Sequence, residues 1–396
     1  MPLLSETGMG EVISQAGRAH LRWAMIDGIG PLIFSRLLIQ FGDAIQALEA
    51  PTASLQTVPG IGREKSESIA RGRDSAAVEE EIAAAGEHGV RILCRADPDY
   101  PPGLKHIPDA PIILYVKGDL QPTDAVSVAI VGSRRCTIYG SEQARRFGEL
   151  LAGAGFTVVS GLARGIDAFS HHGAIEAGGR SVAVMGCGLT DIYPPENRAL
   201  ADKLLESGAW ISELPMRGQV RAENFPSRNR IIAGITLGTL VVEASQRSGA
   251  LITARLASEY NREVFAIPGR VQDPMSMGTN GLIRDGSAKL TMCLEDILDE
   301  LGEVGTAMRE TGEDRADHPG TPKREADAAA AGEPLRLSVA EQRVYGVIGY
   351  EPLLQDVVMR AAELPPGDVL GALTSLELKG LVRRLPGLQV VRRGQA

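Results

Sequence analysis

Val128-Ala-Ile-Val-Gly-Ser-Arg-Arg135 is a continuous apolar run that stops at a glycine and continues with a serine and two arginines. A run without alternating polar residues is typical of a parallel strand that helices cover on both faces. The turn after such a strand is a common anion site, because the following helix begins with unpaired backbone N–H groups and a partial positive charge. The stretch therefore predicts an α/β sheet with a phosphate-binding turn at Gly132, Ser133, Arg134 and Arg135.

This turn differs from the dinucleotide-binding fingerprint. Only Gly132 and Gly140 flank it, so the second and third glycines of a GxGxxG motif are missing. Gly186-Cys-Gly188 resembles half of such a loop, but Tyr193-Pro-Pro195 follows too closely for the chain to continue straight into a helix. We therefore expect no NAD or FAD cofactor.

Similar apolar runs recur through the middle of the chain, separated by segments with a helical period. After a first strand at 112–118, strands are expected at 128–131, 157–160, 181–185, 209–212, 239–243 and 264–267. Helices are expected between them at 143–154, 168–177, 196–206, 227–235 and 249–261. The pattern predicts a doubly wound parallel sheet, whose ligands lie at the carboxyl ends of its strands.

Residues 1–95 are expected to form a helical domain before this sheet domain, which spans 96–302. Two glycine hairpins interrupt the helices, at Gly28-Ile-Gly-Pro31 and Val58-Pro-Gly-Ile-Gly62. Both fit the helix-hairpin-helix pattern, in which glycines allow backbone N–H groups to face a phosphate at a helix start. The hairpins fit equally well as simple turns of a compact helical domain.

The C-terminal part divides into a linker and a small domain. Alanine, glycine, proline and mixed charges dominate 303–336, which predicts a flexible linker. In 337–396, a capping box at Ser338, two helices at 354–362 and 366–379 and a strand–turn–strand segment at 380–393 predict a winged helix. Its acidic and basic residues nearly balance, which favours a protein contact or weak DNA binding over strong duplex binding.

Bulk composition narrows the function classes. The 396 residues carry a net charge of −9, which excludes a basic coat for duplex DNA and leaves only a local basic groove. The four cysteines form no CxxC pair, so we expect neither a zinc site nor a disulfide framework, as suits a reducing cytoplasm. The sequence shows no signal peptide and no apolar run long enough to span a membrane.

Further polar groups follow the other strands. Ser160, Gly161 and Arg164 come after the second predicted parallel strand. Phe225-Pro-Ser-Arg-Asn-Arg230 lies where a helix is expected to begin, and cations are disfavoured there by the helix dipole. Arg228 and Arg230 therefore indicate an anion that offsets their charge.

Asp167 and the histidines after it are the candidates for catalysis. Asp167 is better interpreted as an acceptor for nearby backbone N–H groups than as a catalytic acid. His171 and His172 have no cysteine or carboxylate cluster with metal-ligand spacing beside them. We predict no catalytic residue, no metal and no cofactor.

Four motifs in this order strongly resemble the DNA-processing protein A family (DprA, also called Smf). They are Ile-Val-Gly-Ser-Arg134, Ser-Gly-Leu-Ala-Arg-Gly-Ile-Asp167, Phe-Pro-Ser-Arg-Asn-Arg-Ile-Ile-Ala-Gly234 and Gly-Ala-Leu-Ile-Thr-Ala254. The resemblance implies an extended Rossmann-like domain that binds single-stranded DNA without sequence preference, between a SAM-like or helix-hairpin-helix-like domain and a winged helix. It also implies homodimers, protection of incoming DNA in natural transformation, and loading of RecA recombinase.

The resemblance places strand binding on Gly132, Ser133 and Arg134 and on Arg228, Asn229 and Arg230. Single-strand binders combine a basic groove with aromatic side chains on which bases stack. Aromatic residues make up only 4% of the chain, but Phe225 lies beside the second segment. Phe225 fits a stacking platform and a core anchor at the helix start about equally.

Two other function classes remain open. Rossmann-like phosphoribohydrolases, which act on nucleoside monophosphates, share a Gly-Ser-Arg turn and carry a glycine-rich PGGxGTxxE loop. Leu237-Gly-Thr-Leu-Val-Val-Glu243 keeps Gly238, Thr239 and Glu243 of that loop but lacks its paired glycines. A transcription regulator acting through the winged helix is the other alternative, weakened by the near-neutral tail and by the absence of a clear effector domain.

Overall fold

A computed structural model describes residues 13–73, 75–317, 337–349, 353–362, 364–379, 381–385 and 389–392. The chain divides into two compact units, Met1–His318 and Pro319–Ala396. The predicted linker at 303–336 falls partly outside the described residues, and each unit is treated by itself below. No helix in the described part of the chain is both long and apolar enough to cross a lipid bilayer.

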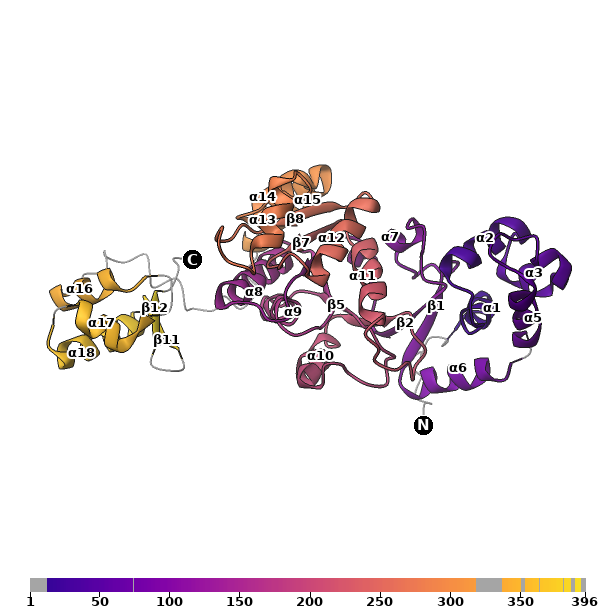
Figure 1. Cartoon of the computed structure of the whole chain (residues 1–396), viewed down its shortest axis with the longest axis horizontal. Coiled ribbons are helices and arrows are strands. Elements are labelled where there is room, and N and C mark those ends of the chain that lie inside the picture. The colour runs from indigo at the N-terminus through magenta and orange to yellow at the C-terminus, as the bar shows by residue number, and fades with distance from the viewer. Residues whose placement is uncertain are drawn as a thin grey trace, which may run out of the picture. The chain divides into compact units, whose positions relative to one another are not determined.

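The first unit begins with a group of six helices (Figure 1). They pack around Trp23, Phe34 and Leu37, and the Trp23 Nε1–H donates to the carbonyl of Ala44 at 2.9 Å. The helices are α1 (Gln15–Ala24), α2 (Pro31–Phe41), α3 (Ala44–Glu49), α4 (Thr52–Leu55), α5 (Arg63–Gly72) and α6 (Ala77–Glu87).

The two glycine hairpins lie directly before α2 and α5. Gly28 and Gly60 adopt φ values of 80° and 94°, which only glycine adopts at little cost. A side chain on Gly28 would meet Lys65 of α5, and one on Gly60 would meet Arg36 and Ile33 of α2. The hairpins therefore pack against each other's helices, an arrangement compatible with both interpretations of the pattern.

A nine-stranded sheet follows, in the order β1-β2-β6-β5-β4-β3-β7-β8-β9. Strands β3 to β9 run parallel to one another, whereas β2 pairs antiparallel with β6 and β1 pairs antiparallel with β2 at that edge. The predicted doubly wound parallel sheet is thus confirmed. The strands are β1 (Val90–Cys94), β2 (Ile113–Gly118), β3 (Ser127–Val131), β4 (Thr157–Ser160), β5 (Ser181–Val184), β6 (Ala209–Ser212), β7 (Gly238–Val241), β8 (Glu263–Ala266) and β9 (Lys289–Leu290).

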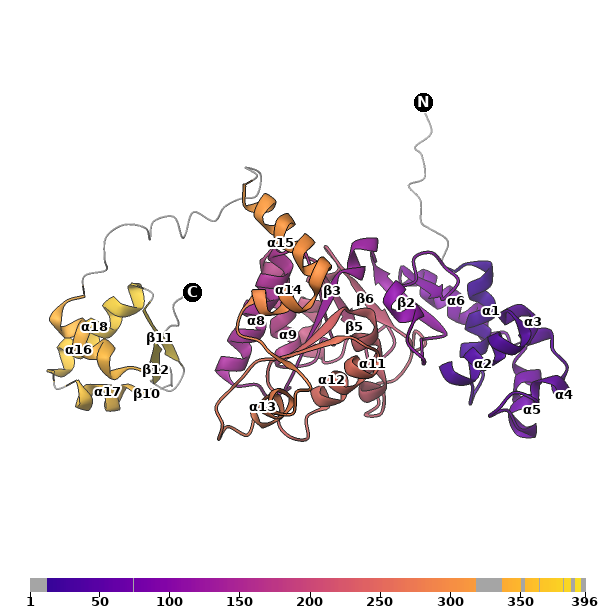
Figure 2. The ribbon, with the colours of Figure 1, turned by 90° about the horizontal axis from the view of Figure 1, so that it is seen from above.

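Helices cover both faces of this sheet (Figure 2). Side chains of α8, α9 and α14 form one core cluster with Val128 and Ile130 of β3, and those of α11 and α12 form another with Ala129 and Val131. The remaining elements of the unit connect the strands or follow the sheet. They are α7 (Pro102–Lys105), η1 (Pro122–Ala125), α8 (Ile138–Gly153), α9 (Ile166–Glu176), η2 (Pro195–Asn197), α10 (Arg198–Leu204), α11 (Asn224–Ile235), α12 (Gly249–Glu259), α13 (Met277–Arg284), α14 (Leu294–Glu300) and α15 (Gly302–Asp317).

Helix α15 occupies a segment in which the sequence predicts no regular structure. Glu, Arg, Ala and Met favour a helix there, but the segment also contains three glycines and carries no apolar period. Met308 packs against the core cluster of α8 and α14, and Arg309 forms an ion pair with Asp299 at 2.8 Å. Contact with α14 therefore stabilises a helix that its own sequence pattern does not indicate.

The second unit is a winged helix, as predicted. A three-stranded sheet in the order β10-β12-β11 packs with three helices around Val344, Val358 and Leu376. The elements are α16 (Val339–Val347), β10 (Leu353–Leu354), α17 (Gln355–Ala361), α18 (Pro366–Leu378), β11 (Val382–Leu385) and β12 (Gln389–Arg392).

The capping box at Ser338 is extended by a buried ionic contact. The Glu341 carboxylate accepts from the Ser338 N–H, from the Ser375 hydroxyl and from the Lys379 ammonium, each at 2.6 Å. These donors lower the pKa of Glu341 from 4.5 to about 2, Lys379 having the largest effect. Glu341 therefore connects the start of α16 to the end of α18.

We predict that this contact makes the second unit sensitive to acid. Because the folded pKa lies below the unfolded value of about 4.3, the stabilisation is complete above that pH and is lost as pH falls toward 2. In the full chain, Glu341→Gln should speed amide hydrogen exchange in α16 and α18 at pH 6. That difference from the wild type should shrink as both proteins approach pH 2, and a constant difference would contradict the assignment.

Candidate nucleic-acid interface

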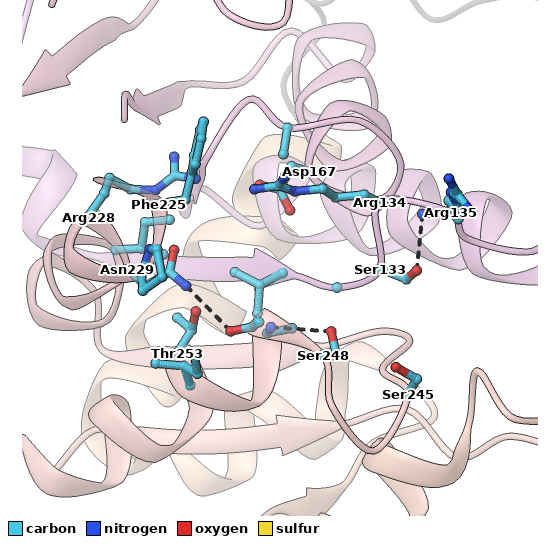
Figure 3. A pocket seen from close by; sticks show the side chains of 18 of the residues that line it. Ser133, Arg134, Arg135, Asp167, Phe225, Arg228, Asn229, Ser245, Ser248 and Thr253 are labelled. Atoms are coloured by element: carbon cyan, nitrogen blue, oxygen red, sulfur yellow. Dashed lines mark hydrogen bonds between the residues drawn. The ribbon is translucent and has the colours of Figure 1, made fainter. Parts of the chain in front are cut away.

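A cavity lies where the direction of the sheet's connections reverses. Strand β3 pairs with both β4 and β7, so successive connections run in opposite directions from it. Ligands of doubly wound sheets bind at such a switch point. A cavity of about 780 Å³ lies there, lined by the loops after β3 and β7 and by residues of α11 and α12 (Figure 3).

The loop after β3 is a fixed turn. A Cβ at Gly132 would lie 2.5 Å from Cγ1 of Ile166 and 2.9 Å from the Glu243 carbonyl oxygen, so this glycine allows close packing. The Ser133 N–H donates to that same carbonyl at 2.8 Å, and the Ser133 hydroxyl accepts from the Arg135 N–H at 3.1 Å. These contacts hold Arg134 and Arg135 exposed at the cavity.

The helix after this turn begins at Ile138, before the start predicted at 143, and its N-terminus is already occupied. Thr137 caps α8 at Ile138, and the Thr137 N–H donates to the Glu243 carboxylate at 2.9 Å, with a second contact from its hydroxyl. Glu243 is 1% exposed. The Glu243 carboxylate therefore occupies the position at the start of α8 where the sequence predicts a phosphate. A phosphate bound in this cavity would be held by side chains.

Arg134 lies over an aromatic ring. Its guanidinium carbon is 4.8 Å from the centroid of Phe225, which is within the range of a cation–π contact. The Phe225 ring also packs against Tyr193, at 5.7 Å between centroids, and against Gly186, where a Cβ would lie 2.9 Å from it. Phe225 is half-buried and lines the cavity, so it both packs at the start of α11 and borders the open space.

Arg228 lines the cavity but is 5% exposed. Its Nη1 donates to the Gly161 carbonyl at 2.8 Å and to that of Val184. Burial lowers the pKa of Arg228 to about 10, with Asp167 acting in the opposite direction. The Asp167 carboxylate accepts from the Gly161 N–H at 3.1 Å, and burial raises its pKa. Asp167 is thus a structural acceptor, and Arg228 is held by the protein itself.

Arg230 lies outside the residues that line this cavity. It is 8% exposed, forms an ion pair with Glu213, and has its Nε 3.7 Å from an oxygen of Asp109. Carboxylates of distant segments therefore offset the charge of Arg230, so its place in α11 does not by itself require an external anion.

Three further predicted residues, Ser160, Gly161 and Arg164, lie at the end of β4 and in the loop after it. Ser160 is fully buried and donates to the Ile130 carbonyl at 2.6 Å. Arg164 is exposed and ion-paired with Glu196, and it borders a small adjoining pocket together with Gly161 and Arg134. Of these, only Arg164 presents a charged group to solvent beside the cavity.

The histidines of α9 lie away from this site. His171 is fully buried, and its Nδ1 lies 2.7 Å from the Ser181 hydroxyl. Burial lowers the pKa of His171 to about 3, so its ring is neutral at physiological pH. Neither His171 nor His172 lines the cavity. Within the described ranges, no group of three or more histidine, cysteine or acidic side chains has metal-binding geometry.

The opposite wall is formed by Asn229 of α11, the loop after β7 and the start of α12. Ser248 caps α12, and its hydroxyl accepts from the Ala250 N–H at 3.3 Å, while Asn229 donates to the Gly249 carbonyl at 3.4 Å (Figure 3). Ser245 and Thr253 complete this polar wall. A serine directly before a helix is an N-cap signal, and Ser248 stands directly before the helix that the sequence predicts from 249.

Comparisons with known proteins agree with this architecture. The family profile described as DNA recombination-mediator protein A matches residues 91–302, and the DprA winged helix domain matches 326–388. Protein Smf of Synechocystis is 34% identical over 94% of this chain and 98% of its own length. DNA processing protein DprA of Bacillus subtilis is 40% identical over 56% of this chain and 75% of its own.

A solved structure extends the likeness to three dimensions. The X-ray structure of DNA processing protein A from Streptococcus pneumoniae superposes with a TM-score of 0.63 at 32% identity, covering 73% of this chain and 98% of that one. Profile, full-length relative and structure agree on one assignment. The chain belongs to the DNA recombination-mediator protein A family of DNA-processing proteins.

Proposed function

We propose that this protein binds single-stranded DNA without sequence preference, in the cavity at the switch point of its sheet. The observation that carries the proposal is the exposed Arg134 lying over the ring of Phe225. A guanidinium contacts phosphate, an aromatic face stacks on any base, and the two together bind a strand regardless of its sequence. The polar wall of Ser245, Ser248 and Asn229 offers further contacts to an extended backbone.

The proposed contact surface for the strand has Arg164 at its margin. It consists of Gly132, Ser133, Arg134, Arg135, Phe225 and Asn229. We assign Arg228 to the support beneath that surface, because its Nη1 donates to the Gly161 carbonyl. We leave Arg230 and Ser160 out, because Arg230 is ion-paired with Glu213 and the Ser160 hydroxyl donates to the Ile130 carbonyl. The proposal involves no cofactor and no catalytic step.

Membership of the family supports the wider role that we propose. The protein protects incoming single strands in the cytoplasm and loads RecA recombinase onto them. It acts as a homodimer through the sheet domain, for which the exposed Leu290 and Met292, beside the short edge strand β9, are the candidate surface.

The two rival functions receive less support from the geometry. A phosphoribohydrolase needs a carboxylate that reaches the sugar, but Glu243 is buried and caps α8. A regulator that reads duplex DNA needs a basic recognition helix, but α18 carries Asp368 and Glu377 and no arginine or lysine within its bounds.

The test compares a fluorescent 30-nucleotide single strand of mixed sequence with its duplex, by anisotropy, at two salt concentrations. We expect the single strand to bind more tightly and its log affinity to fall by about 0.7 per log salt for each phosphate neutralised. Two unrelated strand sequences should bind alike. Preference for the duplex, or for one sequence, would overturn the proposal.

A further inference from the structure

A second cavity, of about 530 Å³, lies in the helical front part of the first unit. Helix α1 contributes Gln15, Arg18 and Arg22, whose spacing of three and four residues places them along one helix face. Arg73, directly after α5, contributes a third arginine. We call this cavity the arginine pocket. It belongs to different elements from the cavity at the switch point.

The guanidinium groups of this pocket differ in whether their N–H groups have hydrogen-bond acceptors. Arg18 forms an ion pair with Glu79 at 2.6 Å, and Arg73 donates through Nη2 to the Ala50 carbonyl at the end of α3. The Nε atoms of Arg22 and Arg73 are buried, and neither has a hydrogen-bond partner among the described residues. Because a guanidinium only donates, a buried N–H of this kind is satisfied only by an acceptor, and most strongly by an oxyanion.

The rest of the lining limits which anion fits. Ala19 and Leu48 are buried and Ile45 is exposed, so one wall of the pocket is apolar. The volume lies in the range of small-molecule sites and exceeds what a free phosphate fills. Glu49 and Glu79 border the same space, and their negative charge disfavours a polyphosphate or a DNA backbone.

We propose that the arginine pocket binds a phosphate monoester of mononucleotide size. Its phosphate accepts from Arg22 and Arg73, and its apolar part lies against Ile45 and Leu48. This site is separate from the strand-binding cavity and does not depend on it.

Trp23 provides a local signal for the test. It follows Arg22 in the chain, and its indole N–H donates to the carbonyl of Ala44, the residue before Ile45. The chain has only two tryptophans, so the NMR spectrum of the full-length protein should contain two indole signals, assignable with Trp210→Phe. AMP should shift the Trp23 signal, whereas adenosine should not, and inorganic phosphate should bind more weakly than AMP.

Matched variants identify the site. Arg22→Gln should weaken AMP binding at least tenfold in calorimetry, and Arg22→Lys should retain part of it. Arg71→Gln, which removes an exposed arginine of α5 outside the pocket, should bind as the wild type does. The double variant Arg134→Ala/Arg135→Ala should also keep AMP binding, which separates this site from the strand-binding cavity. Absence of a Trp23 shift, or unchanged affinity in a folded Arg22→Gln protein, would overturn the proposal.

Discussion

Arg134→Ala is expected to lower the affinity for a single-stranded oligonucleotide about tenfold or more at low salt, which corresponds to ~1.4 kcal/mol. The side chain is exposed, is fixed by the turn at Ser133, and lies over Phe225. Its removal takes away one phosphate contact and one partner of the ring that stacks on a base. Because the side chain is exposed, its removal should change the thermal unfolding of the protein only slightly.

The salt dependence makes this result specific. Loss of one neutralised phosphate should reduce the slope of log affinity against log salt by about 0.7. Arg146→Ala is the matched control, since Arg146 is an exposed arginine of α8 that does not line the cavity. If Arg146→Ala lowers affinity as strongly as Arg134→Ala, the effect reflects net charge alone and the contact at Arg134 is refuted.

The sheet was predictable because its determinants are local. Continuous apolar runs such as Val128–Val131 identify buried strands, and their order along the chain implies a doubly wound sheet with a site at the carboxyl ends. The position of Arg134 and Arg135 beside the cavity followed from the same local argument. The start of α12 at Gly249, which Ser248 caps, was predictable in the same way, because a serine before an apolar helical period is a local signal.

The features of the site that the sequence did not predict depend on contacts between distant segments of the chain. The start of α8 is capped by Glu243, which lies 106 residues from Thr137 in the chain. Arg230 is paired with Glu213 and lies near Asp109, carboxylates that no spacing rule connects to the start of α11. A single sequence shows that an arginine stands at an unfavourable position, but only the fold shows whether its counter-charge comes from the protein or from a ligand.

Replacing Arg228 tests whether its counter-charge comes from the protein or from a ligand. If the protein supplies the partner, Arg228→Ala should destabilise the fold by about 3–5 kcal/mol, because it leaves the buried Asp167 without its neighbouring cation. The carbonyls of Gly161 and Val184 would also lose their donor. Urea unfolding of the full chain, followed by near-ultraviolet circular dichroism, measures this loss for the first unit.

The pH dependence of that loss identifies its cause. Without Arg228, the already raised pKa of Asp167 should rise further, so the folded variant binds a proton more readily than the unfolded chain. Its stability should therefore fall as pH rises above the unfolded value of about 3.9, and the deficit relative to wild type should be larger at pH 8 than at pH 5. Adding Asp167→Asn should recover part of the loss and make it less dependent on pH. If Arg228→Ala instead keeps full stability and only weakens strand binding, Arg228 is a ligand contact, and the support assigned to it beneath the cavity is wrong.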